Sequence, residues 1–123
     1  MIWTLRALFG IVLACMIGVT ALASQDRSVF LAFGELLRDP WGLATLADAY
    51  FGFLTFYVWV AYKEAGWLGR GLWFVLIMAF GNIAMALYML LQLFRVPSGA
   101  SLETILLRSR PRAAREGGFT PPE

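Results

Sequence analysis

Three long apolar runs dominate this chain, at residues 2–23, 41–62 and 72–94. Each is close to the length of about 20 residues that a helix needs to cross a hydrocarbon core about 30 Å thick. Asp48 is the one formal charge that lies well inside any of these runs. A helix satisfies its own backbone hydrogen bonds, so it can span lipid, where water is absent. The runs therefore predict an all-α membrane protein with three transmembrane helices.

The composition agrees with this prediction. Hydrophobic residues make up 60% of the chain, and its mean hydropathy is +0.71. Charged residues make up 15%, whereas a soluble domain carries about 25%. A length of 123 residues suggests a single domain. We expect a three-helix transmembrane domain at 1–96, followed by a basic tail at 97–123.

Residue types that commonly carry chemistry are rare here. The chain has no histidine, which is the commonest general base and a usual axial ligand of haem. Its one cysteine, Cys15, can form neither an internal disulfide nor a cysteine-based metal cluster. Phosphate-binding glycine loops and the common catalytic motifs are also missing. We therefore expect no cofactor, no metal site, no catalytic residues and no enzymatic activity.

The first run has two interpretations. Arg6, the apolar stretch and the small residues before Ser24 fit a secretory signal peptide. A stripe of small residues at three- and four-residue spacing instead favours a retained helix, because such a stripe lets helices approach closely in lipid. The stripe comprises Ala7, Gly10, Ala14, Gly18 and Ala21. We favour the retained helix.

Residues 25–40 connect the first two runs and have a helical periodicity of their own. The apolar positions are Val29, Phe30, Phe33, Leu36 and Leu37. This pattern predicts a short amphipathic helix in the membrane interface, with a lid over an interhelical site as the alternative. Asp39 can cap the helix that follows, and Pro40 suits its first turn.

The short segment 63–70 predicts that the second and third transmembrane helices form an antiparallel hairpin. After the third helix, at 72–94, the pattern indicates a short amphipathic turn following Ser101. Residues 109–123 are expected to be disordered. The tail arginines can attract anionic lipid. No aromatic residue alternates with them, so we expect no nucleic-acid partner.

The polar residues within the apolar runs form a candidate site. Asp48 lies about 10 Å inside the second helix, and a charge at that depth should face the bundle rather than lipid. Asn82 lies near the middle of the third helix, offset by about 6 Å from Asp48 in the predicted hairpin. The two could bond directly or through a water molecule or Tyr50. The candidate intramembrane polar site comprises Asp48, Asn82, Thr55 and Tyr50.

Two main interpretations of this site stay open, beside binding of a hydrophobic ligand or a partner helix. In the first, Asp48 and Asn82 join the helices, at about 0.6 kcal/mol per hydrogen bond. In the second, Asp48 is a proton or cation site, because an intramembrane carboxylate is a functional hypothesis by default. Transport would then require an oligomer, since three helices enclose no pathway.

Two motifs resemble a known family. They are DAYFGFLTFYVWVAYKE at 48–64 and GNIAMALY at 81–88. With the apolar segment between them, they are similar to a small integral membrane family of bacteria and plants, catalogued as a domain of unknown function. The resemblance implies a three-helix membrane protein without an assigned activity, and it transfers no catalytic residue. The expected location is a cell membrane, the bacterial inner membrane, crossed several times.

The sequence favours a structural or accessory subunit that lies in the lipid bilayer, as a homo-oligomer or within a larger membrane complex. The alternative is a proton- or cation-coupled transporter or channel oligomer that uses Asp48. Three helices would place Arg6, Lys63 and Arg70 on one side of the membrane. The other side would hold Arg27, Arg38, Arg95 and the tail arginines. The larger group predicts that residues 25–40 and the tail lie in the cytoplasm.

Overall fold

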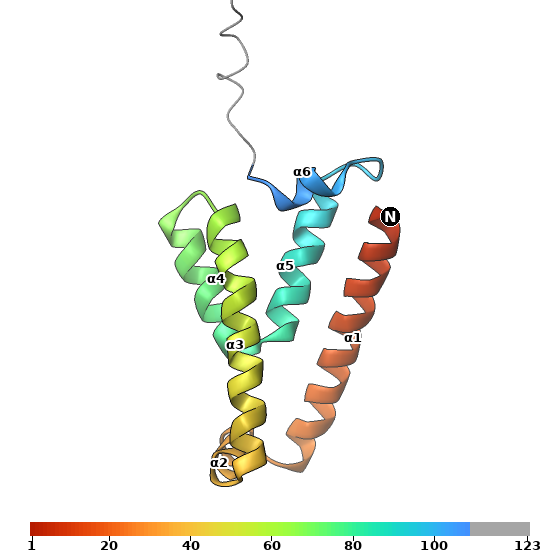
Figure 1. Ribbon diagram of the computed structural model, residues 1–123. Coiled ribbons are helices and arrows are strands. Elements are labelled where there is room, and N and C mark those ends of the chain that lie inside the picture. The colour runs from red at the N-terminus through yellow and green to blue at the C-terminus, as the bar shows by residue number, and fades with distance from the viewer. Residues whose placement is uncertain (109–123) are drawn as a thin grey trace, which may run out of the picture.

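The computed structural model describes residues 1–108, and every regular element in that part of the chain is a helix (Figure 1). The prediction of an all-α fold is therefore confirmed. The predicted disorder of 109–123 falls outside the described residues. The helices, in order, are α1 (Ile2–Asp26), α2 (Val29–Arg38), α3 (Pro40–Lys63), α4 (Trp67–Phe80), α5 (Asn82–Phe94) and α6 (Leu102–Leu106).

The helices α1 and α3 are long and apolar enough to cross a membrane. They contain 25 and 24 residues, or roughly 37 Å each at the rise of an α-helix. Their bounds agree with the predicted helices at 2–23 and 41–62. Between them, α2 confirms that the amphipathic segment after residue 25 is helical.

A tight corner joins α2 to α3. The Asp39 carboxylate accepts a hydrogen bond from the Gly42 amide at 2.7 Å, and Pro40 occupies the first turn of α3. Both features were expected from the sequence. Gly42 lies so close to α2 that a Cβ atom there would be 2.6 Å from the carbonyl oxygen of Leu36. The corner therefore holds α2 against the start of α3.

The third apolar run contains two helices, so the prediction of one helix over 72–94 is wrong. Gly81 separates α4 from α5 and has φ 53° and ψ −122°, a combination that favours glycine because it has no Cβ atom. A Cβ atom at Gly81 would lie 2.6 Å from Cζ of Phe53. The break thus depends on the freedom of a glycine backbone and on the close approach of α3.

After Gly81, the chain returns to the end of the bundle from which α4 began (Figure 1). Near the start of α4, the Tyr57 hydroxyl donates a hydrogen bond to the carbonyl oxygen of Arg70 at 3.0 Å. In the middle of α5, the Tyr88 hydroxyl donates to the Glu64 carboxylate at 3.0 Å. With 14 and 13 residues, each of these helices is shorter than the roughly 20 residues of a single crossing.

Two apolar clusters hold the helices together. The first joins α3, α4 and α5 through Val60, Ile77, Ala84 and Tyr88. The Tyr88 ring packs edge-on against Phe56, Trp59 and Trp73, with centroids 4.8–6.3 Å apart, which is the range that aromatic pairs prefer. The second cluster joins the start of α1 to the end of α5 and to α6 through Ile2, Leu93 and Ile105.

Arg6 fastens α1 to the end of α5. Its guanidinium donates hydrogen bonds to the carbonyl oxygens of Leu93 at 2.9 Å and Val96 at 3.1 Å. It also lies over the rings of Trp3 and Phe94, 4.9 and 4.8 Å from their centroids. Carbonyl groups at the end of a helix have no partner within the helix, so the arginine supplies donors where α5 lacks them.

The return of α5 gathers basic residues at one end of the bundle, which we call the basic end. Its described basic residues are Arg6, Lys63, Arg70, Arg95 and Arg108, whereas Arg27 and Arg38 lie at the α2 end. The prediction that separated Arg95 from Arg6, Lys63 and Arg70 is therefore wrong. The error came from the break at Gly81, which keeps α4 and α5 from continuing to the opposite end as one helix.

Candidate functional site

Among the residues predicted to form the intramembrane site, Tyr50 faces the α4–α5 pair. Its hydroxyl donates a hydrogen bond to the carbonyl oxygen of Met78 at 3.3 Å. Its ring packs edge-on against Phe53, 5.3 Å between centroids. Tyr50, Phe53, Tyr57 and Val60 follow the spacing of one helix face, and this is the face that α3 turns toward α4 and α5.

Asp48 and Thr55 lie away from that face. Both are exposed on the chain. The Thr55 hydroxyl donates a hydrogen bond to the carbonyl oxygen of Phe51 in its own helix, at 2.8 Å. Asp48 makes no hydrogen bond or ion pair with any described residue. The prediction that Asp48 faces the bundle is wrong for the single chain, since Phe53 and its neighbours occupy the face toward α4 and α5.

Asn82 begins α5 directly after Gly81 and is also exposed. No hydrogen bond joins it to Asp48 in residues 1–108. Tyr50 bonds to Met78, four residues before Asn82, and Asp48 lies two residues before Tyr50. Asp48, Tyr50 and Asn82 therefore lie at a similar level in the helix bundle. The structure thus brings Tyr50 against α4 but leaves Asp48 and Asn82 on the surface of the single chain. A role for them as one site stays a prediction.

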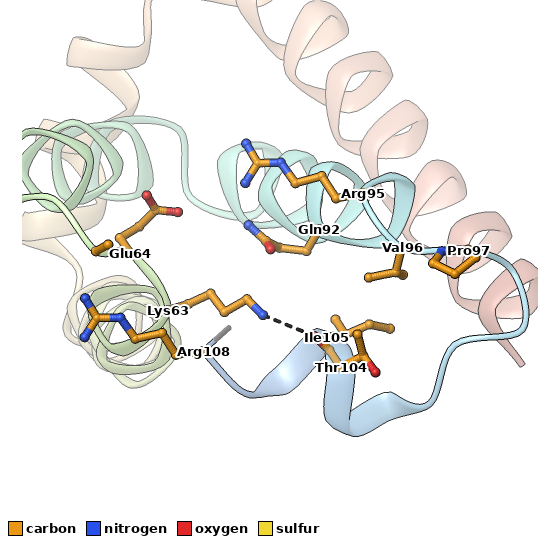
Figure 2. Close-up of a pocket in the computed structure, with 10 residues that line it drawn as sticks. Lys63, Glu64, Gln92, Arg95, Val96, Pro97, Thr104, Ile105 and Arg108 are labelled. Atoms are coloured by element: carbon orange, nitrogen blue, oxygen red, sulfur yellow. Dashed lines mark hydrogen bonds between the residues drawn. The ribbon is translucent and has the colours of Figure 1, made fainter. Parts of the chain in front are cut away.

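A second candidate site lies at the basic end, where the chain forms a half-open hollow of about 500 Å³ (Figure 2). It lies between the ends of α3 and α5 and the short helix α6. Its polar lining residues are Lys63, Glu64, Gln92, Arg95, Thr104 and Arg108. Val96, Pro97 and Ile105 supply an apolar part of the lining.

Lys63 is placed at the hollow by the end of α3. Its ammonium group donates hydrogen bonds to the carbonyl oxygens of Leu107 at 2.6 Å and Thr104 at 3.4 Å. Lys63 is the last residue of α3.

Glu64 is the acidic residue of the lining, and its groups are already bonded. The carboxylate accepts the hydrogen bond from Tyr88, and the backbone carbonyl accepts one from Nε of Arg70 at 3.0 Å. The guanidinium groups of Arg95 and Arg108 form no hydrogen bond with a described residue. The hollow therefore carries more positive than negative charge, and its acid is directed toward α5.

Gln92 is the buried polar residue of the lining, with 6% of its surface exposed. Its amide makes no hydrogen bond with another described residue, and Figure 2 shows it directed into the hollow. This site was not predicted from the sequence. Its only local signal is that Lys63 and Arg95 each follow an apolar run, and their proximity depends on the break at Gly81.

The fold and the two candidate sites define an all-α protein with two helices of membrane-crossing length and one broken apolar hairpin. The chain belongs to the family described as "Protein of unknown function (DUF1475)", which it matches over residues 1–113. This membership confirms the resemblance carried by the motifs at 48–64 and 81–88. No match was found among curated proteins or among solved structures.

Proposed function

We propose that this chain is a non-enzymatic integral membrane protein that acts as a structural or accessory subunit. The helices α1 and α3 cross the bilayer, and the pair α4–α5 enters and leaves it at the basic end. Three crossings would require α4 and α5 to form one continuous helix through Gly81. The positive φ of Gly81 and the contact of Arg6 with the end of α5 both support the two-crossing arrangement.

The distribution of positive charge supports an orientation. The basic end holds Arg6, Lys63, Arg70, Arg95 and Arg108, and the α2 end holds Arg27 and Arg38. Lys and Arg are enriched in the cytoplasmic segments of membrane proteins. We infer that the N-terminus and residues 95–108 lie in the cytoplasm, and that residues 27–39 lie on the other side.

The proposal that the protein acts through a partner rests on the exposure of Asp48. A carboxylate at this depth in a lipid-facing helix costs about 2.5–3.5 kcal/mol, and intramembrane charges almost always face protein or a water-filled cavity. Asp48 and Asn82 are both exposed on the single chain. A second chain that covers them would supply the polar groups that lipid lacks, and would make this protein one subunit of an assembly.

The exposed surface of α1 supports the same conclusion. None of its most apolar 18-residue window is buried. Within the small-residue stripe, Ala7, Ala14 and Gly18 are exposed, and a Cβ atom at Gly18 would meet nothing within 4 Å. The side chains that pack near α5 are Ile2, Leu5 and Phe9 instead. The stripe is thus available to a helix of another chain.

Copurification in a mild detergent tests this proposal. We expect the tagged full chain to be recovered in a complex, either with copies of itself or with other membrane proteins. Gly18→Leu should reduce that recovery, because the added side chain would separate two closely packed helices. Val19→Leu, about 100° around the same helix, is the control. Recovery of a monomer alone, from every detergent and at native expression level, would contradict the proposal.

A second function is favoured by the same carboxylate. An Asp48 side chain that the partner covers could bind a proton or a cation in the assembled oligomer. Asp48→Asn should then abolish uptake of the ion by vesicles that contain the complex, while the complex itself is still recovered. Unchanged uptake in that variant would leave Asp48 with the structural role only.

A further inference from the structure

We propose that the hollow at the basic end binds a phosphate ester, presented by the headgroup of an anionic lipid or by a soluble molecule. Lys63, Arg95 and Arg108 bring positive charge to it, from the end of α3, the end of α5 and the residues after α6. Basic pockets between helices at the cytoplasmic face of a membrane are a known setting for phosphorylated headgroups.

The arrangement of donors favours phosphate over a simple counter-ion. The guanidinium groups of Arg95 and Arg108 have no hydrogen-bond partner among the described residues, and arginine binds phosphate through two parallel N–H donors. Lys63 differs, because its ammonium group already donates to the carbonyl oxygens of Leu107 and Thr104. Lys63 therefore holds α6 in place and contributes its charge, while the two arginines are available to a ligand.

Gln92 supplies an independent observation. Its side chain is more than nine-tenths buried, lines the hollow and makes no hydrogen bond with a described residue. Its amide atoms nevertheless reach the open space of the hollow, because Nε of Arg6 is the one buried side-chain polar atom without a partner in residues 1–108. The amide NH₂ group of Gln92 could donate to a phosphate oxygen in the hollow. Figure 2 shows Arg95 near Gln92 and Arg108 on the side of Glu64.

The size and lining of the hollow fit a headgroup rather than a bare ion. A volume of about 500 Å³ lies within the range of small-molecule sites. Figure 2 shows Val96, Pro97 and Ile105 on one side and Glu64 and Arg108 on the other, so the hollow has an apolar wall and a polar wall. Trp59 and Tyr62 contact the same segment through Leu106 and Arg108, and such aromatic residues are typical of headgroup depth.

Native mass spectrometry of the full chain in a non-ionic detergent tests the inference. The probes are phosphatidic acid, diacylglycerol with the same acyl chains, and glycerol phosphate as a soluble competitor. We expect phosphatidic acid to be retained and diacylglycerol not, because only the former carries the phosphate. Displacement by glycerol phosphate at similar concentration identifies a site for soluble esters, and resistance to displacement identifies a lipid site. Either result supports a phosphate site.

Substitutions of individual arginines, alone and combined, provide the matched comparison. Arg95→Gln should weaken retention of phosphatidic acid about fivefold, and Arg95→Gln with Arg108→Gln about 30-fold. Arg38→Gln, which removes an exposed arginine at the α2 end, should leave retention unchanged, and Arg95→Lys should restore part of it. Equal retention of diacylglycerol, or an equal loss in Arg38→Gln, would overturn the inference. The assay does not depend on the partner, so its failure would leave the accessory function standing.

Discussion

Gly81 combines a positive φ with a close neighbour, since the Phe53 ring lies where a side chain would begin. In an apolar segment, a single glycine does not by itself break a helix, because glycine is common in transmembrane helices. Here the chain reverses at that position, and the buried residues Ile77 and Ala84 pack on either side of it. The conformation of one residue thus determines the path of the whole third apolar run.

Gly81→Ala should destabilise the folded chain by about 2–4 kcal/mol, because it combines an unfavourable left-handed backbone with overpacking against Phe53. The measurement is thermal unfolding of the detergent-solubilised protein. Gly71→Ala, in α4, is the control, since a Cβ atom there would meet nothing within 4 Å. Equal stability of the two variants would show that the break does not depend on Gly81.

Arg6→Gln should lower stability by about 1.5–3 kcal/mol, the usual value of hydrogen bonds to a charged group. The variant loses the bonds to Leu93 and Val96 and the contacts with two aromatic rings. Arg6→Lys should recover only part of this, because an ammonium group lacks the planar fork of donors. The same unfolding measurement applies, with Arg38→Gln as the matched surface control.

Among the elements, α3 has two distinct faces. One carries Tyr50, Phe53, Tyr57 and Val60 toward α4 and α5, and the other carries the exposed Asp48 and Thr55. Asp48 was expected on the inner face because charge avoids lipid. The structure places aromatic residues inside, where their rings pack around Tyr88 and Phe74. The face with Asp48 and Thr55 is therefore exposed on the single chain.

Phe53→Asp should reduce the yield of folded protein strongly, because it would bury a carboxylate beside Gly81 with no partner in the described chain. Asp48→Leu should be inserted at least as well as the unmodified chain, since leucine removes the cost of the charge. The measurement is the folded protein extracted from membranes. Tolerance of Phe53→Asp at the wild-type level would contradict the assignment of the inner face.

The sequence predicts the separate elements well and their arrangement less well. Hydropathy and caps gave the bounds of α1 and α3, the helix at 29–38 and the capping role of Asp39, because these depend on neighbouring residues. The break at Gly81 depends on Phe53, 28 positions earlier in the chain, so no local pattern contains it. The hollow at the basic end follows from that break, and for this reason Gln92 and Arg95 were not predicted to meet Lys63.

At the scale of the whole molecule, a topology with two crossings and one with three differ in the side of the membrane that holds the residues after α5. Single cysteines can be labelled by a membrane-impermeant thiol reagent in a Cys15→Ala background. In intact cells we expect Ser28→Cys to react and Ala65→Cys and Ser98→Cys to be protected, because only the first lies outside the cytoplasm in the proposed orientation. All three positions are exposed on the chain.

Three crossings give a different labelling pattern, in which Ser28 and Ser98 share one side and Ala65 lies on the other. Permeabilised cells, in which every cysteine should react, provide the control for accessibility. Equal reactivity of Ser28→Cys and Ser98→Cys in intact cells would therefore refute the return of α5. It would also show that α4 and α5 cross the membrane together as one segment.

The contact of Arg6 with the end of α5 has a consequence for how copies of this protein can be combined. Because the start of α1 and the end of α5 lie side by side, a head-to-tail fusion of two copies needs no additional crossing between them. In the proposed two-crossing arrangement, both copies would enter the membrane in the same orientation and would be related by an axis along its normal, as in transporters with parallel repeats. An inverted repeat, by contrast, would require an extra transmembrane segment in the linker.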